Sequence, residues 1–286
     1  MPAQPTHPIT QTSTEPAVHA ISTGTLCVHR AFERARGRGP GRFARALFDR
    51  QFSDELPIHA WLINHPEGPI LVDAGELAAT SPPPVARFNV RREHEIDAQL
   101  AAIGLRPSDL RHVVLTHLHG DHINGLARLA GTRVLASAEA LHRGGSRVLA
   151  RRGTVAEPLT LAAEPFGAFA RSLRLTEDGR VMVVPVPGHA RGQIAVIIDA
   201  GDRHIMLGAD SAFTQQQLLD LHPDGVSFSA RTAIRSMRTI LDHARLHATV
   251  FLPSHDPQSA ARLTAREALA VTRHPVLRSV DSPSQR

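Results

Sequence analysis

The chain has 286 residues, of which 42% are hydrophobic, so it is long enough and apolar enough to bury a sizeable core. No run approaches the ~18 consecutive apolar residues that cross a bilayer, and the single cysteine, Cys27, excludes an internal disulfide. All 32 basic residues are arginines, but the net charge is only +5. This modest excess favours neither nucleic acid nor a membrane as a partner.

The first 20 residues are rich in proline, threonine and glutamine, which is typical of a disordered leader. They lack the cationic start and the apolar run of a secretory signal, so we expect a cytoplasmic protein. Strand and helix patterns mix through residues 21–286 without a clear linker. We therefore expect that range to form a single domain. The oligomeric state is open, and a homodimer is one alternative.

Seven arginines, interleaved with glycines, lie between Arg30 and Arg50. Such basic stretches bind single-stranded nucleic acid when aromatic side chains stack on the bases, and Phe32, Phe43 and Phe48 are nearby. Glycine, however, also favours irregular backbone. We expect a solvated, mobile loop here rather than a nucleic-acid surface.

Paired apolar runs predict two β-hairpins. Residues 60–64 and 70–72 flank a turn that contains proline and glycine, and residues 194–198 and 204–207 flank a second glycine-containing turn. In both pairs an aspartate follows the second strand. The two parts of the chain therefore repeat one plan, which indicates an architecture of two similar halves.

Helices and further strands are predicted between and after these hairpins. Apolar residues at helical spacing predict one helix that ends at Gly104 and another around Met237. Short β-rich runs occupy residues 112–115, 133–135 and 181–186. Helices that flank two mixed sheets make an α/β sandwich the expected fold class.

A metal-binding segment, Thr116–His122, directly follows one of these strands. His117 and His119 are separated by one residue, so both can aim at one ion if the backbone is extended. The glycine that follows permits a sharp turn, after which Asp121 and His122 point toward a second ion. Neutral imidazole and carboxylate suit zinc and similar divalent metals. The spacing favours a metal site over a polar turn with incidental histidines.

Three further candidate ligands end apolar runs in the same way. His189 follows the run 181–186, Asp210 follows the second hairpin, and His255 follows a run that ends at Leu252. Open sheets assemble sites at strand ends from distant parts of the chain. A structural zinc site is typically cysteine-rich and closed, and the chain has no suitable cysteine. These residues therefore predict a catalytic metal site.

The motif and its three distant partners resemble the metallo-β-lactamase superfamily, over roughly residues 58–263. The strand end Leu71-Val72-Asp73-Ala74-Gly75 resembles the early aspartate turn of that superfamily. Within it, the N-acyl-homoserine lactonases look most similar. Leu56-Pro57 before the first hairpin and the segment 251–256, with no extra domain after it, carry that narrower resemblance.

The resemblance implies an αββα four-layer sandwich of two similar halves, with the site at one edge. It implies two divalent metal ions, zinc being expected, which share a hydroxide that attacks the lactone or ester carbonyl of a small-molecule substrate. Asp121 would protonate the leaving alkoxide, and Asp73 would either steady the ligand loops or only form the turn after its strand. The implied ligands are His117, His119 and His189 for one ion, Asp121, His122 and His255 for the other, and Asp210 for both.

One position departs from the lactonases that the chain resembles. In them a tyrosine three residues after the bridging aspartate donates a hydrogen bond to the substrate carbonyl, whereas here Asp210 is followed at that spacing by Phe213 and the chain has no tyrosine. Either the metals alone stabilise the carbonyl or the preferred substrate differs, and Phe213 is expected to line an apolar substrate pocket. The open alternatives are a phosphotriesterase or phosphodiesterase, a thioesterase, and a non-catalytic metal-binding protein.

Overall fold

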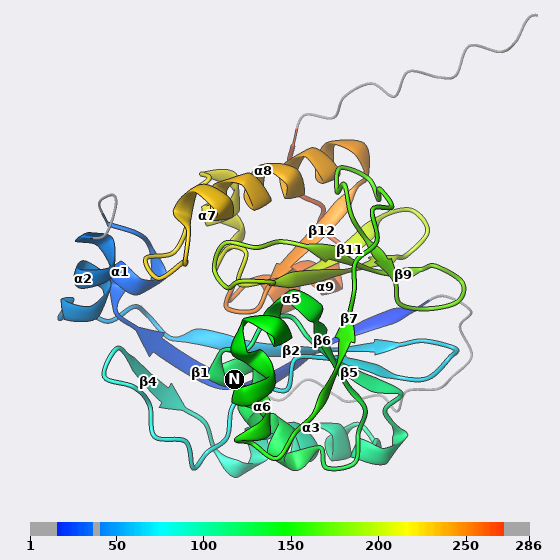
Figure 1. Ribbon diagram of the computed structural model, residues 1–286, viewed down its shortest axis with the longest axis horizontal. Coiled ribbons are helices and arrows are strands. Elements are labelled where there is room, and N and C mark those ends of the chain that lie inside the picture. The colour runs from blue at the N-terminus through cyan, green and yellow to red at the C-terminus, as the bar shows by residue number, and fades with distance from the viewer. Residues whose placement is uncertain (1–15, 37–40, 272–286) are drawn as a thin grey trace, which may run out of the picture.

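Two β-sheets dominate residues 16–36 and 41–271, which the computed structural model describes (Figure 1). The first sheet comprises β1 (Ala17–Val28), β2 (Leu56–Asn64), β3 (Ile70–Val72), β4 (Ala86–Asn89), β5 (His112–Leu115), β6 (Val134–Ser137) and β7 (Ala156–Leu159). The second comprises β8 (Leu173–Arg174), β9 (Val181–Pro185), β10 (Ile194–Asp199), β11 (His204–Ala209) and β12 (Thr249–Pro253). The strand orders are β4-β1-β2-β3-β5-β6-β7 and β12-β11-β10-β9-β8.

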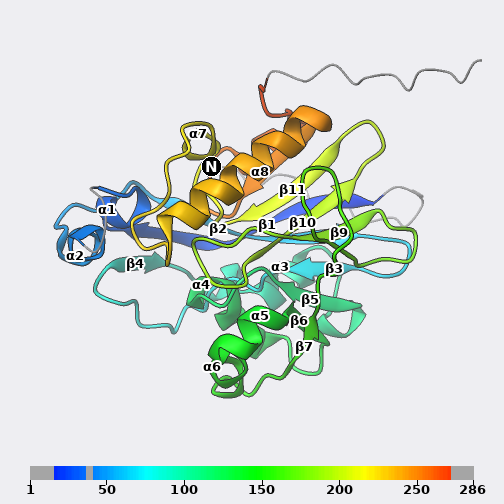
Figure 2. The same ribbon diagram turned by 45° about the horizontal axis from the view of Figure 1, so that its top comes forward.

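Helices cover the outer faces of both sheets. The helices are α1 (Arg30–Glu33), α2 (Gly41–Phe48), α3 (Ile96–Ala102), α4 (Gly120–Ile123), α5 (Ala138–Ala140), α6 (Ser146–Ala150), α7 (Gln215–Leu219), α8 (Ala230–Leu246) and α9 (Ser259–Ala265). Figure 1 shows α8 on one side of the sheets and α3 on the other, and Figure 2 shows α8 lying along the second sheet. Among the described residues, none of these helices has the length and apolarity that a membrane crossing requires.

Three apolar clusters account for the layers. One lies between the sheets and joins Val72 and Val114 of the first sheet to Val196 of the second. A second cluster packs α3, through Leu100, against the outer face of the first sheet, and a third packs α8, through Ile240, against the outer face of the second. Burial of apolar surface on both faces of each sheet stabilises this arrangement. The expected αββα four-layer sandwich is confirmed.

Both predicted hairpins are present, and parallel strands extend each of them. β2 pairs antiparallel with β3, which continues in parallel to β5, β6 and β7. β10 pairs antiparallel with β11, which lies parallel to β12. The carboxyl ends of β3 and β5, and likewise those of β11 and β12, therefore meet at a common edge. The two predicted helices are also confirmed, as α3 and α8.

Backbone strain occurs where two of these strands end. Asp73, directly after β3, has φ = 62°, and Ala209, the last residue of β11, has φ = 48°. Residues other than glycine adopt such values at a cost of about 1–3 kcal/mol, and strain of this kind is concentrated at functional sites. Both residues turn the chain at the edge where the parallel strands end.

Two expectations about the N-terminal region need correction. The expected leader falls outside the described residues up to residue 15, but its last four residues, 17–20, form the start of β1. The expected arginine-rich loop instead forms α1 and α2, with residues 37–40 outside the described part. Arg42 is buried and donates to the carbonyl of Ser227, and Arg34 pairs with Asp220. These contacts order a segment whose composition resembles a loop.

Candidate metal centre

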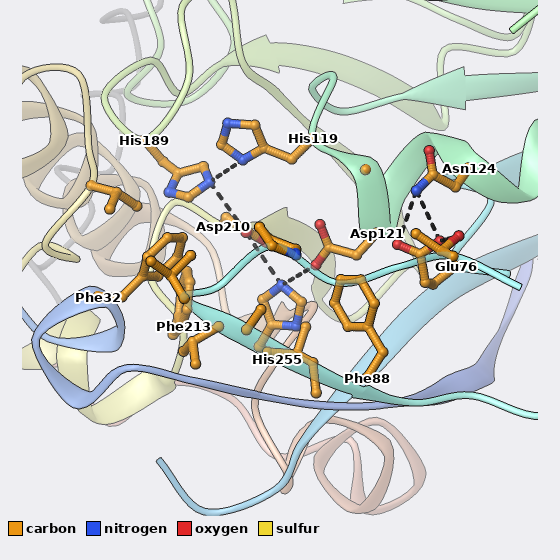
Figure 3. A pocket seen from close by; sticks show the side chains of 18 of the residues that line it. Phe32, Glu76, Phe88, His119, Asp121, Asn124, His189, Asp210, Phe213 and His255 are labelled. Atoms are coloured by element: carbon orange, nitrogen blue, oxygen red, sulfur yellow. Dashed lines mark hydrogen bonds and ion pairs between the residues drawn. The ribbon is translucent and has the colours of Figure 1, made fainter. Parts of the chain in front are cut away.

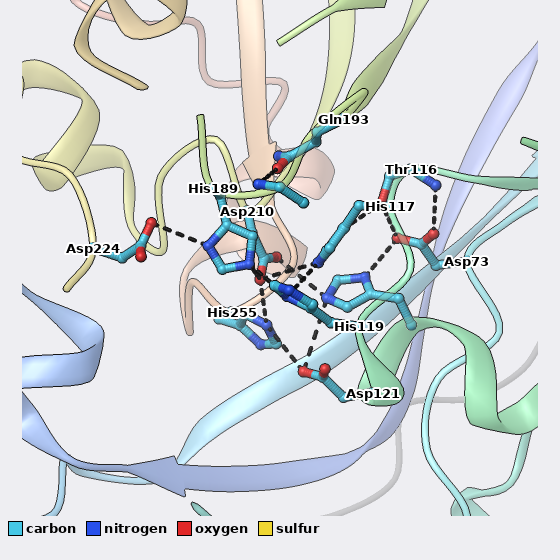
Figure 4. A network of polar contacts seen from close by, with 12 residues as sticks. Asp73, Thr116, His117, His119, Asp121, His189, Gln193, Asp210, Asp224 and His255 are labelled. Carbon is cyan, nitrogen blue, oxygen red and sulfur yellow. Dashed lines mark hydrogen bonds and ion pairs between the residues drawn. The ribbon is translucent and has the colours of Figure 1, made fainter. Parts of the chain in front are cut away.

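Seven histidine and aspartate side chains converge at the edge where the strands end (Figure 4). Four of them come from the turn after β5 and the start of α4, and the other three follow β9, β11 and β12. They form two groups whose potential ligand atoms lie within 4.8 Å of one another. The first group contains His117, His119, His189 and Asp210, and the second contains Asp121, His122 and His255.

In the first group, three imidazoles direct ring nitrogens at one another. His119 Nδ1 lies 3.1 Å from His117 Nε2 and 2.8 Å from His189 Nε2. Asp210 Oδ2 lies 3.4 Å from His189 Nε2 and 3.8 Å from His117 Nε2. Such a convergence of nitrogen lone pairs and a carboxylate oxygen matches the donor set of a divalent metal ion.

The second group is joined to the first through Asp210. His255 Nε2 lies 3.3 Å from Asp121 Oδ2 and 3.3 Å from Asp210 Oδ2. His122 Nε2 lies 3.3 Å from Asp210 Oδ1 and 3.8 Å from Asp121 Oδ2. The two oxygens of Asp210 thus contact histidines of both groups, which is the geometry that a shared carboxylate ligand needs.

Hydrogen bonds at Nδ1 determine which ring nitrogen is free. His255 Nδ1 donates to the carbonyl of Pro57 at 2.8 Å, and a carbonyl can only accept. His122 Nδ1 donates to Asp73 Oδ2 at 2.8 Å, and His189 Nδ1 donates to Asp224 Oδ2 at 3.1 Å. A neutral imidazole that carries its proton on Nδ1 has its lone pair on Nε2. The Nε2 atoms that point into the centre are therefore the ones able to bind metal.

Asp73 joins several parts of the centre. Besides His122, it accepts hydrogen bonds from the backbone nitrogen of Thr116 at 2.8 Å and from the hydroxyl of Thr116 at 2.7 Å. That hydroxyl accepts in turn from His117 Nδ1 at 3.1 Å. One buried carboxylate at the strained end of β3 thus orients two of the histidines.

Asp224 orients His189 as Asp73 orients His122, by accepting a hydrogen bond from the ring. Asp224 was not identified from the sequence. It also accepts from the backbone nitrogens of Val226 and Ser227 and from the Ser227 hydroxyl. In the sequence it stands between Pro223 and Gly225, a pattern typical of a surface turn. No local signal distinguishes it from an ordinary turn aspartate.

The neutral state of His117 and His119 and the unpaired atoms of the cluster fit a metal, whereas the neighbouring carboxylates outweigh burial and raise the pKa values of His122, His189 and His255, from which a bound ion would have to displace the proton. Burial lowers the pKa of His119 to about 4 and that of His117 well below its usual range, so both are neutral, as ligands must be. Burial alone would raise the pKa of Asp210, but His255 and His122 outweigh it and hold that pKa well below the usual range. His122 Nε2 and Asp210 Oδ1 are buried without a hydrogen-bond partner among the described residues. Buried polar atoms are rarely left unpaired unless an ion or water completes them.

A third cluster of potential metal ligands differs from these two groups, because its histidine has no free lone pair. His65, Glu67 and Asp178 lie close together at the turns of the β2–β3 and β8–β9 hairpins. His65 Nδ1 accepts from the backbone nitrogen of Glu67 at 3.2 Å, so Nε2 carries the proton and donates to Asp178 at 3.0 Å. Arg111 pairs with Glu67. Because His65 has no free lone pair, this cluster is a structural contact between hairpins.

A pocket of about 500 Å³ opens above the convergent ligands (Figure 3). Asp121 and His255 form part of its floor, and Phe213 lines it as expected. The Phe213 ring centroid lies 5.0 Å from that of His255 and 5.9 Å from that of His189. Glu76 and Asn124, which sequence reasoning missed, also line the pocket.

Comparisons with known proteins identify the family and the fold of the chain. The family described as the metallo-beta-lactamase superfamily matches residues 53–255. A probable metallo-hydrolase of Mycobacterium tuberculosis is 35% identical over 189 residues, which cover 59% of this chain and only 61% of that relative. The N-acyl homoserine lactonase AttM of Agrobacterium fabrum is 22% identical over 72% of this chain and 84% of its own length.

Solved structures show the same fold. An N-acyl homoserine lactone hydrolase with the product N-hexanoyl-L-homoserine bound at its catalytic metal centre superposes with a TM-score of 0.68. The match covers 86% of this chain and 95% of that one, at 18% sequence identity. At this identity the likeness concerns the fold alone.

Proposed function

Because the chain belongs to the metallo-beta-lactamase superfamily and is a metal-dependent hydrolase, we propose that it holds two divalent ions, zinc first, and opens lactones or cleaves esters. The observation that carries this proposal is the pair of ligand groups that share Asp210 at the floor of one pocket. N-acyl-homoserine lactones are the substrate class that we expect. The names of several relatives support that choice.

Each ion has its own set of side chains. The first set is His117, His119 and His189, the second is Asp121, His122 and His255, and Asp210 belongs to both. When bound, the ions supply Lewis acidity and a water that ionises near neutral pH. Sets of imidazole and carboxylate ligands are typical of catalytic zinc sites, so zinc is the ion that we expect first, although imidazole also suits other divalent transition metals.

Asp121 is the residue that we expect to move the proton. Its side chain is partly exposed, at 17%, and lies on the pocket floor, whereas Asp210 is only 3% exposed. In hydrolysis a water oxygen bonds to the acyl carbon, the bond from that carbon to the leaving oxygen breaks, and one proton passes from the water to the leaving oxygen. The Asp121 carboxylate accepts that proton and then delivers it.

Phe213 makes part of the pocket wall apolar and leaves it without a hydrogen-bond donor at that position. Its ring is 2% exposed and packs near Phe32, with ring centroids 6.5 Å apart. A phenyl ring excludes water and contacts an apolar substituent, but it donates no hydrogen bond to a carbonyl oxygen. Stabilisation of that oxygen is therefore left to the bound ions, which is compatible with lactones and other esters alike.

Metal analysis combined with a substrate panel tests the proposal. We expect about two zinc ions per chain after reconstitution. Measured by the pH drift that the released acid causes, hydrolysis of an acyl-homoserine lactone should be faster than that of a phosphotriester, a thioester or a β-lactam. His119→Ala should abolish hydrolysis and reduce the metal content, because His119 contacts two other ligands. Full activity in that variant, or a metal-loaded wild type without any hydrolysis, would contradict the proposal.

A further inference from the structure

The pocket above the candidate metal centre has two chemically different ends (Figure 3). Phe32 and Phe213 lie together at one end. Glu76 and Asn124 lie on the opposite side of the floor formed by Asp121 and His255. A substrate that spans the pocket therefore meets the aromatic wall of Phe32 and Phe213 on one side of its reacting carbonyl, and polar side chains together with the ring of Phe88 on the other.

The polar end holds one guanidinium besides the carboxyl group of Glu76. Among the described residues that line the pocket, Arg152 is the only arginine or lysine. Its Nε donates to Asn124 Oδ1 at 2.9 Å, and its Nη1 donates to the carbonyl of Val148 at 3.2 Å. A guanidinium has five N–H groups. Those two hydrogen bonds leave three donors for other partners.

A buried carboxylate fixes the orientation of this guanidinium. Asn124 Nδ2 donates to Glu76 Oε1 at 2.8 Å and to Glu76 Oε2 at 3.0 Å, and carboxylate oxygens accept from the NH₂ end of an amide but not from its oxygen. Asn124 must therefore present its oxygen to Arg152. Glu76 is itself fully buried and held by the backbone nitrogen of Leu77 at 2.8 Å and by the hydroxyl of Thr80 at 2.6 Å. The row Glu76–Asn124–Arg152 is thus ordered from its buried end outward.

The metal-binding segment leaves room for this row. A Cβ atom added at Gly120 would lie only 3.0 Å from Asn124 Nδ2 and 3.7 Å from Glu76 Oε2. The absence of a side chain at Gly120 lets the amide of Asn124 reach Glu76 beside the candidate ligands. The guanidinium is therefore pre-organised near the reacting centre, and pre-organisation reduces the entropy lost when a ligand binds.

We propose that Arg152 is a specificity-determining residue that selects substrates bearing a carboxylate on the side of the scissile bond opposite the aromatic wall. The inference rests on the proposed lactone or ester hydrolysis and names a subclass of esters within it. N-acyl-homoserine lactones carry no carboxylate and lie outside this subclass, so the preference is expected among other esters. A planar guanidinium with free N–H groups matches the two oxygens of a carboxylate. Arg152 is exposed, so the carboxylate keeps part of its hydration and its desolvation cost stays small.

A matched series of three substrates tests this selection. The esters share one acyl group and differ only at the end of the alcohol portion, which carries a methyl group, a methyl ketone or a carboxylate. For the wild type we expect kcat/KM to be about tenfold higher for the carboxylate-terminated ester than for the methyl-terminated ester, because KM is lower, and this ratio corresponds to about 1.4 kcal/mol. High salt should reduce the preference, because it screens the charge pair.

Substitutions then assign the preference to Arg152. Arg152→Met should remove it, so that within this variant kcat/KM for the carboxylate-terminated ester equals that for the methyl-terminated ester, and Arg152→Lys should retain only part of the preference, because the charge remains without the planar fork. Arg151→Met is the matched control, since Arg151 is an exposed neighbour that does not line the pocket. It should behave as the wild type.

Three results would overturn the inference: no carboxylate preference in the wild type, the same preference in Arg152→Met, or equal preference for the ketone and the carboxylate. Failure of the proposed function is distinguishable, since it would leave all three esters intact. In that event, the affinity for the dicarboxylate adipate is measured by calorimetry on the metal-loaded wild type and on metal-loaded Arg152→Met, and the comparison tests whether Arg152 binds a carboxylate. Tighter binding by the wild type supports the role of Arg152, and equal binding removes it.

Discussion

At the scale of single residues, Asp224 orients one of the candidate ligands, His189. It accepts from His189 Nδ1 at 3.1 Å and is fixed by Ser227. We expect Asp224→Asn to weaken metal binding by about 10–100-fold, because the ring of His189 loses a charged acceptor that sets its tautomer. Competition with a chromogenic chelator measures the affinity. Asp220→Asn, an exposed aspartate paired with Arg34, is the matched control, and an equal affinity in both variants would contradict the role of Asp224.

Single side chains were predictable where they belong to a spaced pattern. His117 and His119 stand in a short motif, and His189 follows an apolar run with a glycine before it, so their common chemistry is visible in the sequence. Asp224 and Glu76 act through contacts made only in the folded chain, with His189 and with Asn124. Each follows or precedes a glycine and reads as an ordinary turn residue, so the sequence contains no signal for its role.

At the scale of elements, the loop after β9 depends on its contact with α8. A Cβ atom at Gly188 would lie 2.3 Å from the Cα of Ala233 in that helix. Because backbone cannot yield as a flexible side chain does, Gly188→Ala should displace the loop that carries His189. We expect the free energy of unfolding to fall by about 2–3 kcal/mol and the metal content to fall with it.

Urea unfolding and metal analysis measure those two effects. The control is Gly131→Ala, where φ is also positive, at +81°, but a Cβ atom would meet nothing within 4 Å. The free energy of unfolding of that variant should fall only by the cost of a positive φ at alanine, about 1–2 kcal/mol, and its metal content should be unchanged. Equal effects of the two substitutions would show that the contact between the loop and α8 is unimportant.

Elements with a clear periodicity were predicted with nearly the observed bounds. The strand at 112–115 and both hairpins are present as expected, because alternation of apolar residues and glycine-containing turns are local signals. The helices within 30–50 were not predicted. Arg42 stabilises α2 by a contact with Ser227, 185 positions further on, and local composition contains no information about such a contact.

At the scale of the whole molecule, the strand order explains why distant residues meet. β3 lies beside β5 and β11 beside β12, all in parallel pairs, so their carboxyl ends share edges that face one pocket. The repeated plan of strand, turn, strand and aspartate indicated two similar halves, and two sheets are present. The long strand β1 was not predicted, and it adds the β4 edge and part of the pocket wall.

Buried histidines away from the metal centre make the stability of the whole fold dependent on pH. Burial lowers the pKa of His112 and of His204 to about 4 and that of His243 to about 3, against about 6.5 in an unfolded chain. Between these values only the unfolded chain takes up protons. The contribution of the neutral, buried histidines to the free energy of unfolding is therefore complete above about pH 6.5, and it is lost as the pH falls toward about 4.

His112 isolates this effect, because neither of its ring nitrogens has a hydrogen-bond partner among the described residues. We expect the urea midpoint of His112→Leu to exceed that of the wild type by a margin that grows as the pH falls from about 7.5 to about 5. His142→Leu, at an exposed position, should follow the wild type throughout. All three proteins keep the same candidate ligands, so any release of metal in acid affects them equally and cancels in the difference. Parallel curves for His112→Leu and the wild type would show that the protonation of His112 does not couple to folding.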